Sequence, residues 1–152
     1  MDAHGIRVPE RSGARWRRIA VLLEPGRSGD AALDHAVALS REHEAGLAVV
    51  AQAPQAERPR CAGPSPQPFN EAVIEATACQ LRTVRERIGA SGTLELVCAL
   101  LVEGHDPPLE AWVHHQGVEL VLLPARRPFW GRPRHPLAAR LRPHADVRVV
   151  AP

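Results

Sequence analysis

A run of arginines near the C-terminus carries the most unusual chemistry in this chain of 152 residues. From Pro124 to Pro152 there are seven arginines and one acid, Asp146. Two aromatic residues lie within the densest part of the run, which comprises Arg126, Arg127, Phe129, Trp130, Arg132, Arg134, Arg140 and Arg142. Guanidinium groups match phosphate oxygens in geometry, and aromatic rings among them can stack on bases. The run therefore predicts either an anion-binding loop or a solvated loop whose aromatic side chains fold back on the protein.

Ser28 is a second residue of chemical interest, because it follows Pro25-Gly26 at a predicted strand-to-helix turn. A nucleophilic serine in that setting needs the pattern G-x-S-x-G. The stretch here is Gly26-Arg-Ser-Gly-Asp, so the second glycine comes one residue too early. Helix capping is therefore the preferred role for Ser28. An enzyme that uses Glu24 or Ser28 is the least favoured of three functional hypotheses.

The other reactive side chains form no metal or redox pattern. None of the eight histidines has a partner at H-x3-H spacing, and the adjacent His114 and His115 point in different directions on a helix. The cysteines, Cys61, Cys79 and Cys98, include no C-x-x-C pair, which favours a reducing, cytoplasmic compartment. All nineteen basic residues are arginine, so a Walker-type phosphate loop and lysine Schiff bases are excluded. We expect no metal site and no catalytic activity.

Composition predicts one domain with a real core. The net charge of +2 argues against a dedicated nucleic-acid binder. No apolar run reaches membrane-spanning length, and the first seventeen residues hold no hydrophobic segment of the kind found in secretory signals. We expect residues 1–16 to be a disordered arm and residues 17–152 to form a single domain.

Apolar runs and helical spacings alternate along this domain. Ile19 to Leu23 is continuously apolar, as in a strand buried on both faces. The helix capped by Ser28 is expected to stop at Gly46. Pro54 to Pro68 contains five prolines, so we expect a loose connection there rather than helix or central strand. Further strands are predicted at 47–51, 94–102, 118–123 and 147–150, and further helices at 69–90, 106–116 and 136–142.

Asp106 and Pro107 predict the start of the third helix, with Asp106 as its cap and proline in its first turn. Its apolar face includes Trp112, which we expect to be largely buried. The whole alternation of strands and helices predicts a doubly wound α/β fold. Ligands in such folds bind beyond the carboxyl ends of the strands, where the strand order reverses. The candidate loops are 24–28, 103–106 and 124–134.

These elements, in this order and length, resemble the universal stress protein family over roughly Arg17 to Pro152. The residues that carry the resemblance are Arg18-Ile-Ala-Val-Leu-Leu-Glu, Asp30-Ala-Ala-Leu-Asp-His-Ala-Val-Ala-Leu, Glu103-Gly-His-Asp-Pro, Val118-Glu-Leu-Val-Leu-Leu and His144-Ala-Asp-Val-Arg-Val-Val. The resemblance implies a five-stranded parallel sheet of order 3-2-1-4-5 with helices on both faces. It also implies that Glu24 lies beside the loop after Pro124.

The chain departs from the ATP-binding members of this family in two places. Those members carry G-x-x-G-x9-G-[ST] after the fourth strand, where glycines let backbone amides approach the phosphates. Here the sequence from Val118 onward contains one glycine, Gly131. The family's aspartate at the end of the first strand is Glu24 in this chain. We therefore expect ATP to bind weakly or not at all.

The leading hypothesis is a non-catalytic, cytoplasmic stress-response or regulatory protein that resembles universal stress proteins. Neither ATP nor AMP is expected as a cofactor. Neither a membrane nor a specific nucleic acid is expected as a partner. The resemblance also implies a homodimer through antiparallel pairing of the last strand, at Val147, Arg148, Val149 and Val150. The alternative is a nucleotide- or anion-binding module in which the arginine-rich loop 126–134 replaces the glycine motif. Its candidate residues are Glu24, Pro25, Gly26, Gly104, Arg126, Arg127 and Arg132.

Overall fold

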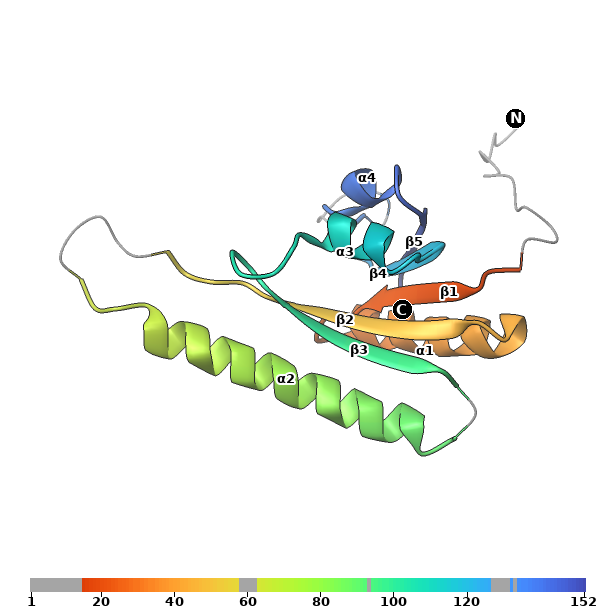
Figure 1. Ribbon diagram of the computed structural model, residues 1–152, viewed down its shortest axis with the longest axis horizontal. Helices are drawn as coiled ribbons and strands as arrows, with labels where there is room; N and C mark the ends of the chain where they lie inside the picture. The colour runs from red at the N-terminus through yellow and green to blue at the C-terminus, as the bar shows by residue number, and fades with distance from the viewer. Residues whose placement is uncertain (1–14, 58–62, 93, 127–131, 133) are drawn as a thin grey trace.

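The computed structural model describes residues 15–57, 63–92, 94–126, 132 and 134–152. Strands and helices alternate along these residues (Figure 1). The strands are β1 (Arg18–Leu22), β2 (Gly46–Ala53), β3 (Leu96–Val102), β4 (Leu120–Pro124) and β5 (Asp146–Val150). The helices are α1 (Arg27–His43), α2 (Gln67–Gly89), α3 (Leu109–His115) and α4 (Ala138–Leu141).

All the strands pair in parallel in one sheet of order β3-β2-β1-β4-β5. The chain runs from β1 outward to β3 and then crosses to β4 on the other side of β1. The strand order therefore reverses between β1 and β4, where a doubly wound sheet places its ligand crevice. The predicted fold class and strand order are confirmed.

The sheet has a hydrophobic core on each face, because successive residues of a strand point to opposite faces. Figure 1 shows α1 and α2 on one face and α3 and α4 on the other. On the first face, Val21 lies in one core cluster with Leu33 of α1 and Leu81 of α2. On the second face, Leu22 lies with Trp112 of α3 and Leu141 of α4. Trp112 is 9% exposed, so its predicted burial is confirmed.

Both predicted boundaries of α1 are wrong. The helix begins at Arg27, with Gly26 as its N-cap at φ 101°, so Ser28 lies inside the first turn and does not cap it. At such a φ, glycine turns the chain into the helix without steric cost, which leaves no position for a capping side chain. The helix ends at His43, and its C-cap, Glu44, takes the left-handed conformation, while Gly46 is already the first residue of β2.

Asp106 does not cap α3. Its carboxylate accepts a hydrogen bond from the Val102 N–H at 2.7 Å and closes the turn after β3, and Pro108 precedes the helix instead. The predicted loose connection 54–68 ends earlier than expected, because α2 begins at Gln67. Pro68 fits its first turn because the missing N–H has no partner there. Strands β3 and β4 begin two residues later than predicted, and α4 is shorter than predicted.

The segment before β1 packs onto the α1 face of the sheet. Trp16 lies against the first core cluster and meets the His43 ring edge-to-face at 4.7 Å. The Arg148 guanidinium of β5 lies over the Trp16 ring, 4.7 Å from its centre. The side chain of Arg15 donates to the His43 carbonyl. The rest of the predicted arm, residues 1–14, lies outside the described residues.

Candidate functional site

A cleft of about 1170 Å³ opens at the carboxyl ends of the strands, at the predicted switch point. Its lining includes the loops after β1, β3 and β4 and the starts of α1, α3 and α4, together with residues from the end of β2 and from α2. These loops meet because parallel strands all end at the same edge of the sheet. The lining includes Glu24, Pro25, Gly26, Gly104 and Arg126. Of the predicted candidates, these residues are therefore brought together.

The start of α1 approaches the end of β1 very closely. A Cβ atom on Gly29 would lie 1.8 Å from the Glu24 carbonyl oxygen, so only glycine fits at this position without a shift. The first hydrogen bond within the helix runs from Asp30 N–H to the Gly26 carbonyl. The preceding backbone amides thus belong to the first turn, whose donors lack helical partners, and their residues line the cleft.

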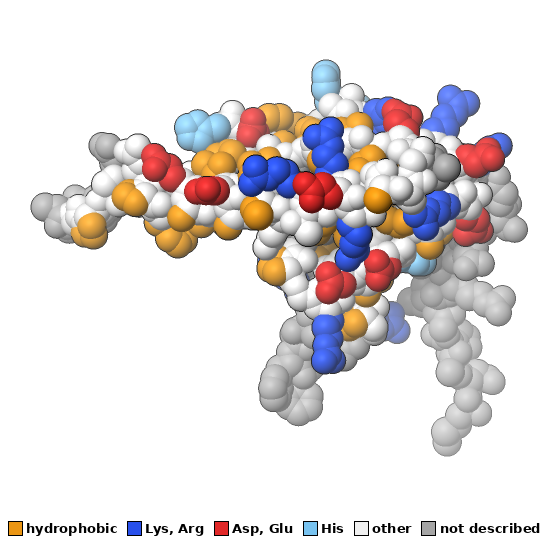
Figure 2. Space-filling view, turned by 90° about the horizontal axis from the view of Figure 1, so that it is seen from below, with side chains coloured by type: hydrophobic (Ala, Val, Ile, Leu, Met, Phe, Trp, Pro, Cys, Tyr) orange, Lys and Arg blue, Asp and Glu red, His pale blue; other side chains and the backbone are white. Residues whose placement is uncertain are grey.

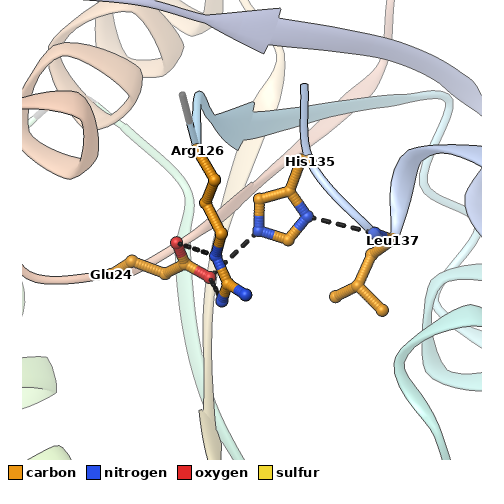
Figure 3. Close-up of polar contacts among 4 residues, drawn as sticks. All are labelled: Glu24, Arg126, His135 and Leu137. Carbon is orange, nitrogen blue, oxygen red and sulfur yellow. Dashed lines mark hydrogen bonds and ion pairs between the residues drawn. The ribbon is translucent and has the colours of Figure 1, made fainter. Parts of the chain in front are cut away.

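Glu24 holds together three segments that are distant in sequence. Its Oε1 accepts hydrogen bonds from Arg126 Nη2 at 2.5 Å and from His135 Nε2 at 3.0 Å, and its Oε2 accepts one from Arg126 Nε at 3.3 Å. Figure 3 shows both side chains converging on the carboxylate. The His135 side chain is fully buried and that of Glu24 is 19% exposed, whereas that of Arg126 is 59% exposed. The cluster is therefore a closed polar contact with one solvated member.

The hydrogen bonds indicate which ring nitrogen of a neutral His135 carries the proton. His135 Nδ1 accepts the Leu137 N–H at 3.2 Å, so in the neutral ring the proton sits on Nε2 and is donated to Glu24. Burial raises the pKa of the Glu24 carboxyl, but the hydrogen bonds from His135 and Arg126 outweigh burial. The pKa of Glu24 therefore lies below its ordinary value, and the carboxylate is ionised at neutral pH.

A second ion pair, between Arg140 and Glu110, joins α4 to the start of α3 at the cleft wall. Burial raises the pKa of the Glu110 carboxyl. Its backbone hydrogen bond and Arg140 together lower the pKa by more, so it lies below its ordinary value. Four carboxylates and three guanidinium groups line the cleft: Glu24, Glu103, Asp106, Glu110, Arg27, Arg126 and Arg140. The described lining is therefore not a basic surface.

The arginine-rich loop supplies fewer cleft residues than predicted. Arg126 lines the cleft, but Arg132 is exposed and is not among the lining residues. Arg127 lies outside the described residues, as do Phe129 and Trp130. The two ends of the loop meet in an antiparallel bridge, in which the Arg126 N–H donates to the Arg134 carbonyl at 2.7 Å.

His135 is the site residue that the sequence analysis missed. It is buried within an arginine- and proline-rich stretch that looks solvated in sequence. The available signal was its position beside Pro136, at the entry to a short predicted helix and close to the switch point. Histidine alone in such a stretch is more often a surface residue.

The described residues hold no group of three His, Cys, Asp or Glu side chains arranged to bind a metal ion. Ser28 makes no hydrogen bond to a histidine in the part of the chain that the structure describes, and it faces the cleft from inside a helix turn. None of the described helices is both long and apolar enough to span a bilayer.

No protein-family model matches this sequence, and no curated protein matches it either. Solved structures do match its fold. A universal stress protein family member from Burkholderia pseudomallei has a TM-score of 0.70 and 22% identity, over 91% of this chain and 98% of that one. UspA from Lactobacillus plantarum has a TM-score of 0.65 and 17% identity, over 90% and 99% of the two chains.

A third match is the universal stress protein from Archaeoglobus fulgidus in complex with dAMP. It has a TM-score of 0.56 and 17% identity, over 91% of this chain and 98% of that one. At these identities the likeness concerns the fold. The chain has the universal stress protein fold over nearly its whole length, which confirms the resemblance at that level.

Proposed function

We propose that this chain is a non-catalytic stress-response or regulatory protein of the universal stress protein type, with weak or no ATP binding. The observation that carries the proposal is the Glu24 cluster. The residue at the end of β1 is already engaged by Arg126 and His135 from the segment after β4. In the family's ATP-binding members, these two regions contact the nucleotide. A nucleotide that contacted these two regions here would compete with a charge-assisted contact within the chain.

Two further features support weak binding of phosphates. The segment after β4 carries arginines and prolines in place of the family's glycines, so backbone amides there cannot approach a triphosphate as closely. The cleft lining carries one more carboxylate than guanidinium groups. A polyanion entering this cleft therefore gains less than at a purely basic site.

Calorimetry with ATP, together with a thermal-shift series in ATP, AMP and inorganic phosphate, tests the proposal. We expect no shift in Tm at millimolar ligand, because binding to the native state would raise Tm. A dissociation constant for ATP in the low micromolar range would contradict the proposal.

An anion-binding module is the alternative, and two observations favour it. The cleft is large enough for a nucleotide, and the N-terminus of α1 at its wall is a favourable place for negative charge. A structural neighbour is described with dAMP. Under this alternative, Arg126→Gln and Arg140→Gln lower affinity for AMP, while Arg142→Gln, which does not line the cleft, serves as the matched control. Unmeasurable binding of AMP by the unmodified protein and by all three variants supports the first proposal.

The homodimer through β5 and the cytoplasmic location stay proposals beside the functional one. β5 is an edge strand, since β4 is its partner in the described sheet. Val147, Val149 and Val150 are half-buried, whereas Arg148 is exposed and stacks on Trp16. These features support β5 as a candidate interface and also give it partial protection within the chain.

A further inference from the structure

The edge strand β5 carries two opposite charges on the same face of the sheet. Successive residues of a strand point to opposite faces, so Asp146, Arg148 and Val150 share one face while Val147 and Val149 share the other. The packing agrees, because Val150 lies against the core cluster of α1, whereas Val147 and Val149 lie against the cluster of α3 and α4. Asp146 and Arg148 are both exposed. An acid and a base therefore lie two positions apart on the α1 face of this edge.

Neither charge has an oppositely charged partner within the described part of the chain. The ion pairs found there include neither Asp146 nor Arg148. The Arg148 guanidinium lies over the Trp16 ring, which attracts it but carries no formal charge. Figure 2 looks onto the α1 and α2 side of the molecule and shows acidic and basic side chains interspersed, with no broad region of one sign. Local pairs, rather than the field of this face, therefore decide what β5 attracts.

The backbone of β5 determines which of its groups a partner strand can reach. The Asp146 N–H donates to the Glu119 carbonyl, and the Val150 carbonyl accepts from the Ala125 N–H. The even-numbered residues of β5 thus direct their backbone groups toward β4. Because backbone direction alternates along a strand, the odd-numbered residues direct theirs outward.

The outward groups comprise two donors and three acceptors. Val147 and Val149 each present an N–H and a carbonyl. The Ala145 carbonyl also points outward, because it lies opposite the Asp146 N–H in one planar peptide unit. The Ala145 N–H is already used, since it donates to the Leu141 carbonyl. A partner strand can therefore pair along β5 and one residue before it.

Antiparallel pairing of β5 with the same strand of a second copy has three registers. Facing residues must both direct their backbone groups toward the partner or both away from it, so the two-fold axis passes beside Val147, Arg148 or Val149. An axis beside Arg148 sets two arginines against each other, and an axis beside Val149 sets Arg148 against Val150. An axis beside Val147 sets Arg148 of each copy against Asp146 of the other. This last register alone matches both charges.

We propose that β5 pairs with β5 of a second copy about a two-fold axis beside Val147, with Arg148 of each copy bound to Asp146 of the other. The inference rests on the β5 homodimer proposed above and adds the register and the residues that select the partner. Val147 exchanges two backbone hydrogen bonds with its copy, and the Val149 N–H donates to the Ala145 carbonyl of the copy. Facing Cβ atoms lie about 5 Å apart, within reach of an arginine–carboxylate pair. A β5 strand without this charge pattern is a poorer partner.

Charge reversal tests this register. Arg148→Asp sets two acids against each other on both sides of the axis, and Asp146→Arg sets two bases against each other. In sedimentation velocity we expect each variant alone to raise the dimer dissociation constant about tenfold or more. An equimolar mixture of the two variants restores both opposite-charge contacts in one heterodimer and should recover the affinity of the unmodified protein. Arg142→Asp makes the same charge change at an exposed residue outside β5 and should have no effect.

The outcomes separate the dimer from its register. A monomeric unmodified protein would overturn the β5 homodimer and this inference together. A dimer that neither reversal weakens, or a mixture that recovers no affinity, contradicts the register alone. Neither result bears on ATP binding, because Asp146 and Arg148 are not among the residues that line the cleft.

Disulfide cross-linking measures the register directly. In a background of Cys61→Ser, Cys79→Ser and Cys98→Ala, the change Val147→Cys brings two thiols together across the axis, with their Cβ atoms about 5 Å apart. Val149→Cys is the matched control, because its two copies are displaced by four positions, or about 13 Å, along the strands. We expect a cross-linked dimer for Val147→Cys alone. Cross-linking in neither variant, or preferentially through Val149→Cys, would show that the axis does not pass beside Val147.

Discussion

The two edge strands of the sheet, β3 and β5, differ in charge and in what covers them. β5 presents Asp146 and Arg148 to solvent, and the Arg148 side chain is stacked on Trp16 from the segment before β1. β3 presents seven apolar residues and has α2 as its helical cover. One edge is thus charged and shielded within the chain, whereas the other is apolar and shielded on one face. The two edges therefore differ in charge and in how the rest of the chain covers them.

The helices beside the two edges differ in the same direction. α1, which packs on β1, β4 and β5, buries six of its seventeen residues, while α2 buries two of its twenty-three. Figure 1 shows the N-terminal end of α2 reaching beyond the strands, where Phe69 is 61% exposed. A helix with so few buried side chains gains little from tertiary packing. The helix that packs near β4 therefore buries a larger share of its residues than the helix that packs on β3.

The largest expected effect comes from removing a buried side chain on the well-packed side. Trp112→Ala should lower the free energy of unfolding by about 3 kcal/mol or more, as in other large-to-small core changes. Val84→Ala, in the half-buried part of α2, should cost about 1 kcal/mol. Denaturant unfolding at low protein concentration measures both. Equal losses would remove the contrast in packing.

A pair of glycine substitutions sharpens the comparison on the backbone. Gly29→Ala forces a Cβ against the Glu24 carbonyl oxygen, so we expect a loss of about 1–3 kcal/mol. Gly89→Ala, near the end of α2, meets no atom within 4 Å and should gain up to about 1 kcal/mol from helix propensity. Thermal unfolding of both variants distinguishes these signs, and a neutral Gly29→Ala would show that α1 can shift freely.

Amide hydrogen exchange reports on the two edges in one experiment. We expect the outward amides of Val147 and Val149 in β5 to exchange about tenfold more slowly at high protein concentration, because the proposed β5 dimer covers them. The outward amides of Leu96, Cys98 and Leu100 in β3 should show no dependence on concentration. Protection that changes at β3 instead would exchange the roles of the two edges.

The smallest effect concerns the polar cluster between β1 and β4. Because the folded pKa of Glu24 lies below its unfolded value of about 4.3, its stabilising contribution is present above that pH. The contribution is lost as the pH falls through the folded pKa. The difference in Tm between the unmodified protein and Glu24→Gln should therefore shrink in acid. A difference that widens below about pH 4 would reverse the sign assigned to Glu24.

The strands were predictable because their signal is local and redundant. Runs such as Ile19 to Leu23 are apolar whichever residue begins the strand, so the order of elements was correct although several bounds moved. The helix ends were less predictable, since single backbone conformations decide them. Gly26 and Glu44 take positive φ values, and neighbouring residues offered equally good capping signals.

The site was predictable in part for a similar reason. Glu24 and the loop after β4 were expected to meet because the strand order puts their strands side by side. His135 contacts Glu24 across 111 positions, and no local spacing signals such a contact. Nor could the sequence distinguish the β3 edge from a central strand, because both read as continuous apolar runs.

The bridge between Arg126 and Arg134 has a consequence for engineering. The Arg126 nitrogen and the Arg134 carbonyl oxygen lie 2.7 Å apart, so the two ends of the arginine-rich loop are held together. The entropy of closing a loop grows only slowly with its length, so residues added between these two positions should cost little stability. We expect this point to accept an inserted peptide tag or a small reporter domain, with the Glu24 contacts beneath it retained.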